Sequence, residues 1–385
     1  MATHDAVLGS APGAKNRVGS LWRGRMGELG ARPWSIGVCL GRVLAAALIC
    51  AVAVLMLADA ADAKSRRGGS RHAAPSAAPA ALDAQAVNAA QLPAPSGKGR
   101  ARAPDAAAII KSEILLDRAG FSPGQIDGKT GTNYQKAVRA FQDANAIKPS
   151  GNLDPQTWER LTATSSDPVL VEYEVQPGDV KGPFNETIPK QLEKKAELKT
   201  LNFTGPRELL AEKFHIDPGL LTRLNPKAPF ETAGTKIMVP NVAKKPSEAK
   251  VAKVVVDKSQ RTVRALDGGG KLVSFYPASV GSEERPAPSG TRTIRSVADN
   301  PTYYYSPKLK FKGVKTQKPF TVPPGPNNPV GNTWMDLGDG YGIHGTPEPG
   351  NIGKTESHGC VRLTNWDAQA LGKKVHKGTK VEFIN

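Results

Sequence analysis

The sequence predicts a multidomain protein with a small all-α three-helix module, an α+β module and a mostly-β C-terminal domain. Its length of 385 residues is enough for two or three domains of ordinary size. Two stretches of linker composition, one rich in Ala and Pro and one charged and Pro-containing, separate segments with different hydrophobic patterns. Apolar residues recur at helical spacing after the first linker, whereas short apolar runs between Gly-rich turns follow the second.

Residues 1–63 have the pattern of a secretory signal peptide. Positive charges up to Arg42 precede an uncharged apolar run, 43–58, and small-residue sites of the A-x-A type follow it. The run is shorter than the roughly 20 residues that a spanning helix needs, which favours cleavage. The long stretch before it leaves a signal anchor, and membrane anchoring through an uncleaved leader, as the alternative. We therefore expect an exported protein of the periplasm or cell envelope.

The formal net charge of +17 indicates an anionic partner. Nucleic acid, a membrane surface and an acidic wall polymer all meet that requirement. Because the leader predicts export, we expect no nucleic-acid partner.

The cysteine count points to one residue. Cys39 and Cys50 lie in the predicted leader, so Cys360 would be the one cysteine of the mature chain. An exported protein normally pairs its cysteines, and a lone thiol there is a candidate for reactivity.

Residues 64–105 and 106–165 differ sharply in composition. The first segment is dominated by Ala, Pro, Ser, Gly and Arg, which predicts a disordered linker. The second has two amphipathic stretches, around Ile109 and Phe141, and a third short helix that begins at Pro155 after an Asp154 cap. It resembles the peptidoglycan-binding domain type 1 family, which implies a wall-binding module; a purely structural helical spacer is the alternative. The matching residues are Gly120-Phe121, Ile126-Asp127-Gly128, Gly131, Ala137-Val138, Phe141-Gln142, Gly151, Leu153-Asp154 and Thr157-Trp158.

Residues 170–242 predict a strand, two helices and a closing strand. This order resembles a LysM module, a wall-glycan binder, and a long insertion at roughly 181–205 departs from that pattern. We expect His215 to be a surface residue at a helix end. The residues that carry the resemblance are Val175-Gln176-Pro177-Gly178-Asp179, Leu224-Asn225-Pro226 and the stretch 234–240.

Residues 250–385 predict the mostly-β domain, with a short helix capped at Thr364 or Asn365 near its end. Within it, 341–365 contains two His and Cys360. A cysteine nucleophile needs a base, amide groups for an oxyanion and an open approach. His344 and His358 are both candidates for the base.

Other residues of the stretch complete the candidate site. Gly359 and Cys360 offer backbone amides for an oxyanion, and Arg362 can favour the thiolate or hold a substrate carboxylate. A salt bridge within the fold is the alternative role of Arg362. Two His and one Cys could also bind zinc, but the spacing is not a familiar zinc pattern, so we expect no metal.

The same stretch resembles the YkuD-type L,D-transpeptidase signature. That resemblance implies that His344 is the general base, oriented by the carbonyl of Gly345, and that His358 shapes the site. It also implies a thioester between Cys360 and a peptidoglycan tetrapeptide stem, with release of D-alanine and no cofactor. The matching residues are His344-Gly345-Thr346, Ser357-His358-Gly359-Cys360-Val361-Arg362-Leu363, Pro288-Ser289-Gly290-Thr291 and Gly331.

Two alternatives to cross-linking follow from the sequence. Water instead of an amine could resolve the thioester, which would make the protein an L,D-carboxypeptidase. A noncatalytic wall-binding protein is the other alternative, although Cys360 and His344 are both present.

Overall fold

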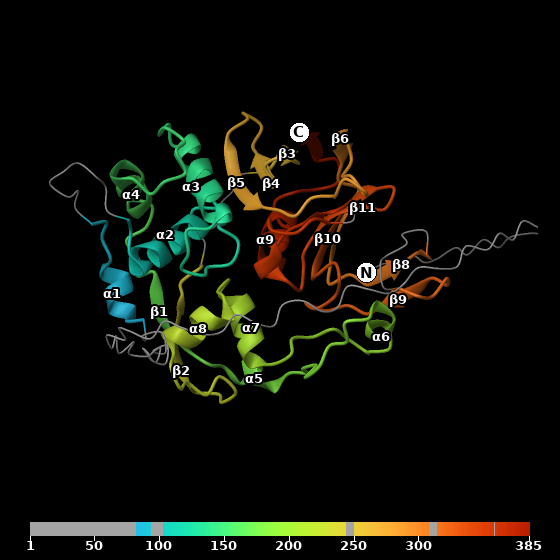
Figure 1. Ribbon diagram of the computed structural model, residues 1–385, viewed down its shortest axis with the longest axis horizontal. Helices are drawn as coiled ribbons and strands as arrows, with labels where there is room; N and C mark the ends of the chain where they lie inside the picture. Colours follow the sequence, from blue (N-terminus) through green and yellow to red (C-terminus); the bar gives the residue numbers. More distant parts are fainter. Residues whose placement is uncertain (1–81, 94–102, 244–249, 308–313, 358) are drawn as a thin grey trace, which may run out of the picture. The chain divides into compact units, whose positions relative to one another are not determined.

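A computed structural model describes the fold of most of the chain (Figure 1). The described residues are 82–93, 103–243, 250–307, 314–357 and 359–385. The predicted signal peptide and the first part of the predicted linker lie outside them. Among the described residues, no helix is both long and apolar enough to cross a membrane.

Residues 82–93 of the predicted linker have a defined structure, which corrects the prediction of disorder for that part of 64–105. Helix α1 spans Ala84–Ala89 and begins at Asp83, whose side chain accepts a hydrogen bond from the Gln85 amide. Val87 is fully buried. The Asn88 side chain accepts hydrogen bonds from two backbone amides of 169–170 and donates one to the Leu170 carbonyl. Composition did not predict this segment because its contacts are with residues far along the chain.

The three predicted helices of the all-α module are present. Helix α2 spans Ala106–Arg118, α3 spans Thr132–Ala144 and α4 spans Pro155–Thr162. The Asp154 side chain caps α4 by accepting from the Thr157 amide, as its sequence predicts.

The middle region, 170–242, has the predicted order of strands and helices. Strand β1 pairs antiparallel with β2 over five residues. Two further short helices are present: α5 ends where the predicted insertion begins, and α6 lies within that insertion. The bounds are β1 Leu170–Glu174, α5 Pro177–Lys181, α6 Leu192–Ala196, α7 Pro206–Lys213, α8 Pro218–Leu224 and β2 Lys236–Pro240.

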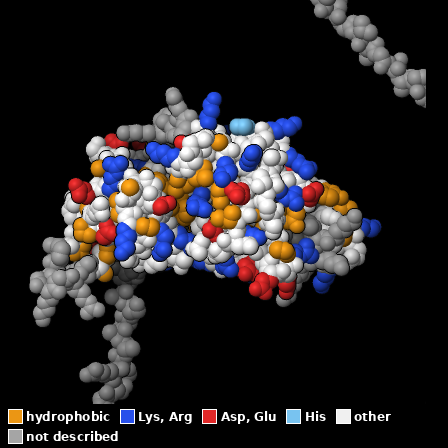
Figure 2. Space-filling model, turned by 90° about the horizontal axis from the view of Figure 1, so that it is seen from above, with side chains coloured by type: hydrophobic (Ala, Val, Ile, Leu, Met, Phe, Trp, Pro, Cys, Tyr) orange, Lys and Arg blue, Asp and Glu red, His pale blue; other side chains and the backbone are white. Residues whose placement is uncertain are grey.

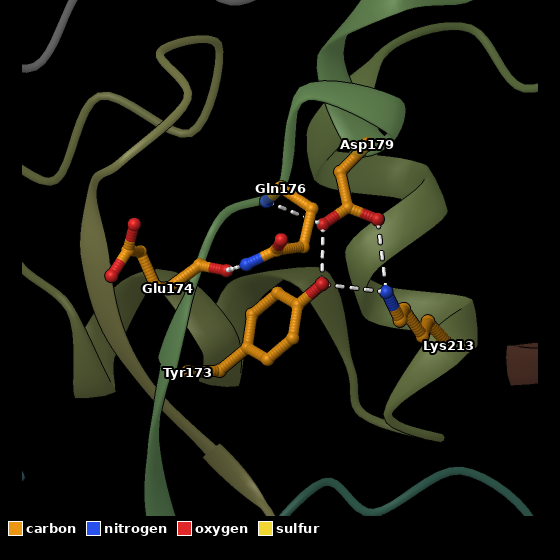
Figure 3. Close-up of polar contacts among 5 residues, drawn as sticks. All are labelled: Tyr173, Glu174, Gln176, Asp179 and Lys213. Atoms are coloured by element: carbon orange, nitrogen blue, oxygen red, sulfur yellow. Dashed lines mark hydrogen bonds and ion pairs between the residues drawn. The ribbon is translucent and has the colours of Figure 1, made fainter.

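A polar cluster ties α7 to the start of this region (Figure 3). The Lys213 ammonium lies 2.9 Å from Asp179 Oδ1 and donates to the Tyr173 hydroxyl at 2.7 Å. Tyr173 in turn donates to Asp179 Oδ2 at 2.6 Å, and so does the Gln176 amide at 2.9 Å. Burial disfavours the charged form of Asp179, but these hydrogen bonds outweigh burial and hold its pKa below the usual range.

The C-terminal domain contains two sheets and a hairpin. The first sheet has the order β5-β4-β3-β13-β6 and the second has the order β12-β11-β10-β7, while β8 pairs with β9. Their apolar faces share one core, which includes Val254, Met335, Ile343 and Leu371. The bounds are β3 Lys253–Asp257, β4 Thr262–Leu266, β5 Leu272–Pro277, β6 Gly290–Thr293, β7 Ser296–Asp299, β8 Tyr303–Tyr305, β9 Phe320–Val322, β10 Thr333–Gly338, β11 Tyr341–His344, η2 Pro349–Asn351, β12 Val361–Arg362, α9 Asn365–Gly372 and β13 Lys380–Ile384.

Helix α9 begins where the upstream parts of the chain contact the C-terminal domain. The Ser122 hydroxyl donates to the buried carboxylate of Asp367 at 2.8 Å. His215 stacks on Trp366, with ring centroids 5.0 Å apart, and its Nδ1 lies 3.1 Å from Asp117. The side chain of His215 is 14% exposed, so its prediction as a surface residue was wrong. Local sequence showed the helix end but not the ring that covers it.

Basic side chains are spread over the surface. Figure 2 shows Lys and Arg over the whole of one face, with fewer acidic groups between them. The distribution agrees with the net charge of +17 and does not by itself outline a single binding patch.

Candidate active site

The second sheet places a row of side chains on one face. His344 lies opposite Arg362 in the parallel pair of β11 with β12 and opposite Trp334 in the antiparallel pair with β10. Trp334 lies opposite Ala298 of β7. Directly opposed residues of neighbouring strands point to the same face of a sheet. All four residues accordingly line one cavity of about 620 Å³.

Cys360 lines the same cavity, just before β12. Its thiol is partly exposed and lies 3.8 Å from the carbonyl oxygen of Gly340. Burial raises the pKa of the Cys360 thiol, while a hydrogen bond from the Gly342 backbone and the charge of Arg362 act in the opposite direction. The net upward shift keeps the resting sulfur protonated at neutral pH.

His344 is held in one tautomer. Its ring is 3% exposed, and Nδ1 lies 2.7 Å from the carbonyl oxygen of Gly345. A carbonyl can only accept, so Nδ1 carries the hydrogen and Nε2 keeps its lone pair. Burial, and then the charge of Arg362, lower the pKa of His344 to about 3 against the hydrogen bond to Gly345. The imidazole is therefore neutral and can accept a proton.

Gly345 sits against Asn365 without room for a side chain. A Cβ at Gly345 would lie 2.2 Å from Asn365 Oδ1, and one at Gly331 would lie 2.0 Å from the same atom. Asn365 is 1% exposed. The sequence predicted Asn365 only as a helix start, and its contact with the glycines behind His344 was missed, because it depends on tertiary packing.

Ser357 and Gly359 shape the turn that carries the nucleophile. The Ser357 hydroxyl donates to the Cys360 carbonyl, and its amide donates to the Val280 carbonyl at 3.0 Å. Gly359 has a φ of +101°, which strongly favours glycine. His358 lies outside the described residues.

Arg362 has no carboxylate within 4.0 Å among the residues that the structure describes. Its Nε is buried without a hydrogen-bond partner in that part of the chain. Burial lowers the pKa of Arg362, opposed by the nearby Cys360, Glu348 and Tyr303. A salt bridge was the alternative role predicted for Arg362, and none is found among the described residues. The Arg362 guanidinium is therefore available to a ligand.

The hairpin β8–β9 supplies an aromatic wall. Tyr303 and Tyr304 line the cavity, and Tyr304 is 62% exposed. Both tyrosines belong to strand β8. Pro301, Thr302, Ser306, Pro329 and Val330 complete the wall.

Comparison with known proteins shows the family of this domain. Residues 252–383 match the family YkuD, described as "L,D-transpeptidase catalytic domain". Residues 106–161 match a "putative peptidoglycan binding domain". The chain is 30% identical over 179 residues to the "putative L,D-transpeptidase YkuD" of Bacillus licheniformis, which covers 46% of this chain and 92% of that protein. The chain therefore belongs to the YkuD family of L,D-transpeptidases.

Other relatives match over a smaller share of their length. The "probable L,D-transpeptidase YbiS" of Escherichia coli K12 is 28% identical over 187 residues, or 47% of this chain and 61% of that protein. The chain thus spans about three-fifths of several of its curated relatives. Among solved structures, L,D-transpeptidase 3 from Mycobacterium tuberculosis is 18% identical, covering 40% of this chain and 76% of that one with a TM-score of 0.30.

These matches confirm the predicted peptidoglycan-binding family and the mostly-β catalytic domain. The LysM-like assignment of 170–242 stays a prediction.

Proposed function

We propose that this protein forms peptidoglycan cross-links through a thioester at Cys360. The observation that carries the proposal is that a partly exposed thiol and a neutral imidazole of fixed tautomer line the same cavity. It stands within a domain of the L,D-transpeptidase family. The helical module, which matches a peptidoglycan-binding family, supports the same polymer as partner.

In the first half-reaction, His344 Nε2 takes the thiol proton while Sγ of Cys360 attacks an amide carbonyl of the tetrapeptide stem. That amide joins the third residue, a diamino acid, to D-alanine. The amides of Gly359 and Cys360 would stabilise the oxyanion. When the intermediate collapses, the C–N bond breaks, His344 returns the proton to the leaving amine, and D-alanine departs, which leaves the thioester.

In the second half-reaction, an amine of a neighbouring stem attacks the thioester. His344 takes a proton from the attacking amine and returns it to the sulfur as the C–S bond breaks. Water in place of the amine would make the same site an L,D-carboxypeptidase. All reacting groups in these two half-reactions belong to the protein and the two stems, so the proposed reaction needs no metal and no organic cofactor.

Arg362 is assigned to a substrate carboxylate, since its guanidinium borders the cavity without a carboxylate partner nearby in the described chain. The aromatic wall would cover the stem and exclude water, which favours the amine acceptor. Ser357 and Gly345 are positioning residues for Cys360 and His344, and His358 is assigned to shaping the site.

We place the enzyme in the periplasm or cell envelope, exported by its leader and held near the wall by its upstream modules. The LysM-like module is proposed to contact glycan. A bound module raises the local concentration of the catalytic domain on the polymer without adding to the chemical step.

Intact-mass measurement tests the reaction. The full chain is incubated with purified disaccharide-tetrapeptide, beside Cys360→Ala and His344→Ala. A thioester adduct and a cross-linked dimer, both lost in Cys360→Ala and strongly reduced in His344→Ala, are expected. A hydrolysed tripeptide without dimer would instead identify a carboxypeptidase. No adduct, no product and no D-alanine would favour the noncatalytic wall-binding protein.

A further inference from the structure

Helix α7 of the middle region reaches the active site through α9. In Figure 1 α7 lies beneath α9, and the two helices are in contact. The Asn365 side-chain amide donates to both carboxylate oxygens of Glu212, at 3.0 and 3.1 Å. Glu212 has no Lys or Arg nitrogen within 4.0 Å in the described part of the chain. Asn365 is therefore its main polar partner there.

Glu212 is one of three neighbours that determine which way the Asn365 amide faces. The same Nδ2 also donates to the carbonyl of Pro326 at 3.1 Å, so acceptors lie on both sides of the NH₂ group. On the other side, Oδ1 accepts the Asn332 amide at 3.2 Å. A reversed amide would place donor against donor at Asn332, and the acceptor oxygens of Glu212 and Pro326 would lose their donor. Both are costly for buried groups.

The orientation of Asn365 matters for His344. Oδ1 is the atom packed against Gly345 and Gly331, within 2.2 and 2.0 Å of where their Cβ atoms would lie. The Gly345 carbonyl is the acceptor that fixes the His344 tautomer. A displacement of Asn365 Oδ1 therefore moves the backbone unit that orients the imidazole.

Helix α7 is itself fixed at two other points. Lys213, the next residue, is paired with Asp179 and Tyr173 (Figure 3). One turn earlier, Glu208 Oε1 accepts the Asn327 side-chain amide at 2.9 Å. Glu212 is thus presented by a helix that is held at two further points and contacts α9 of the catalytic domain.

We infer that Glu212 is a positioning residue for the proposed reaction, which acts from outside the catalytic domain through Asn365 and Gly345 on His344. The inference rests on the proposed function for its role in turnover. The contacts that carry it stand independently of the substrate.

The test replaces Glu212 by residues of similar length with and without an acceptor oxygen. Glu212→Met and Glu212→Leu remove the acceptor, whereas Glu212→Gln keeps one. Burial is the main cause that raises the pKa of Glu212 to about 8, so neutral Gln is a close mimic near neutral pH. Glu231→Ala, at an exposed position in the same region, is the matched control. Each change is made in the full chain, alone and with His344→Ala.

Two rates are measured below the thermal unfolding midpoint of each variant. The first is alkylation of Cys360 by iodoacetamide, which needs no peptidoglycan. General-base catalysis contributes on the order of 10²–10⁴-fold, so we expect acceptor loss to cost roughly tenfold through partial misorientation of the base. The second is turnover of disaccharide-tetrapeptide, in which kcat should fall about tenfold with KM within about twofold.

Lower rates in Glu212→Met or Glu212→Leu, unchanged rates in Glu212→Gln and Glu231→Ala, and no further loss in the His344→Ala background would support the inference. Rates equal to wild type in both Glu212→Met and Glu212→Leu would overturn it. An equal loss in Glu212→Gln, or an equal loss with and without His344, would also overturn it. If wild type shows no turnover, the proposed function fails, while the alkylation comparison still decides the role of Glu212.

Discussion

His344 and Arg362 lie directly opposite each other where β11 and β12 pair in parallel. This register puts a base and a cation on one face of the sheet, and Cys360 joins them two residues before Arg362. The positive neighbour and the burial of the ring both favour neutral imidazole. The resting pair is accordingly a thiol and an imidazole, and a proton must move when the sulfur attacks.

The first prediction concerns the pH dependence of Cys360 reactivity. The pKa of His344 is lowered to about 3 and that of the Cys360 thiol is raised. The imidazole therefore stays neutral as pH rises above about 3, and thiolate accumulates only above the ordinary thiol range. Alkylation by iodoacetamide should rise steadily with pH without an inflection near 6.5, the ordinary value for His. An inflection near 6.5 that disappears in His344→Ala would contradict this assignment.

The second prediction concerns Gly345→Ala. The new methyl group would meet Asn365 Oδ1 at 2.2 Å, so the carbonyl that orients His344 must move. We expect a loss of turnover of about tenfold or more and destabilisation of about 1–3 kcal/mol. Gly268→Ala is the control, since nothing lies within 4 Å of its Cβ position. Stability is measured by urea unfolding. Equal turnover and equal unfolding free energy in the two variants would show that Asn365 moves away from the new methyl group without cost.

The third prediction concerns Arg362→Gln. If the guanidinium holds a substrate carboxylate, the loss of a charge-assisted hydrogen bond should cost about 1.5–3 kcal/mol in kcat/KM. We expect roughly a tenfold to hundredfold fall in kcat/KM for the tetrapeptide stem. The exposed Arg139→Gln is the control for net charge. A donor stem amidated at its carboxylates should lose the difference between wild type and Arg362→Gln; an unchanged difference would assign Arg362 to structure.

The fourth prediction concerns acid stability at Asp179. Its pKa is lowered in the folded chain, so the stabilisation from its charge is fully present above the ordinary value of 3.8 and is lost as pH falls through the folded value. Asp179→Asn should destabilise by about 1–3 kcal/mol at neutral pH. The difference from wild type should shrink below pH 3.8. Urea unfolding over pH checks this, with the exposed Asp143→Asn as control; a difference constant with pH would remove the charge from the explanation.

The fifth prediction concerns helix α1. The Asn88 side chain bonds the backbone of Val169 and Leu170 at 2.8–3.0 Å. Asn88→Ala leaves those groups without their partner and should cost about 1–3 kcal/mol of unfolding free energy. Gln85→Ala, on the exposed side of the same helix, should cost less than about 0.5 kcal/mol. Equal unfolding curves for both variants would show that α1 contributes nothing to stability.

Local features of the fold were predictable, because their causes act within a few residues. Asp154 and Pro155 mark the start of α4, and Thr364 marks the start of α9, since a cap bonds amides two or three positions away. Helix α1 was missed for the opposite reason. Val87 and Asn88 are secured by residues more than twenty positions along the chain, and composition carries no signal of such contacts.

The chemistry available at the candidate site could be predicted from the sequence: Cys360, two histidines, the flanking glycines and a family signature. Tertiary structure decided which groups meet. Strand register places His344 beside Arg362, and burial lowers the pKa of His344. The fold also brings the β8–β9 tyrosines to the cavity and packs Asn365 against Gly345 behind His344. The difference lies in the sequence distance over which the interactions act. Caps and turns depend on near neighbours, whereas register, burial and the contact of Glu212 with Asn365 depend on which distant surfaces pack together.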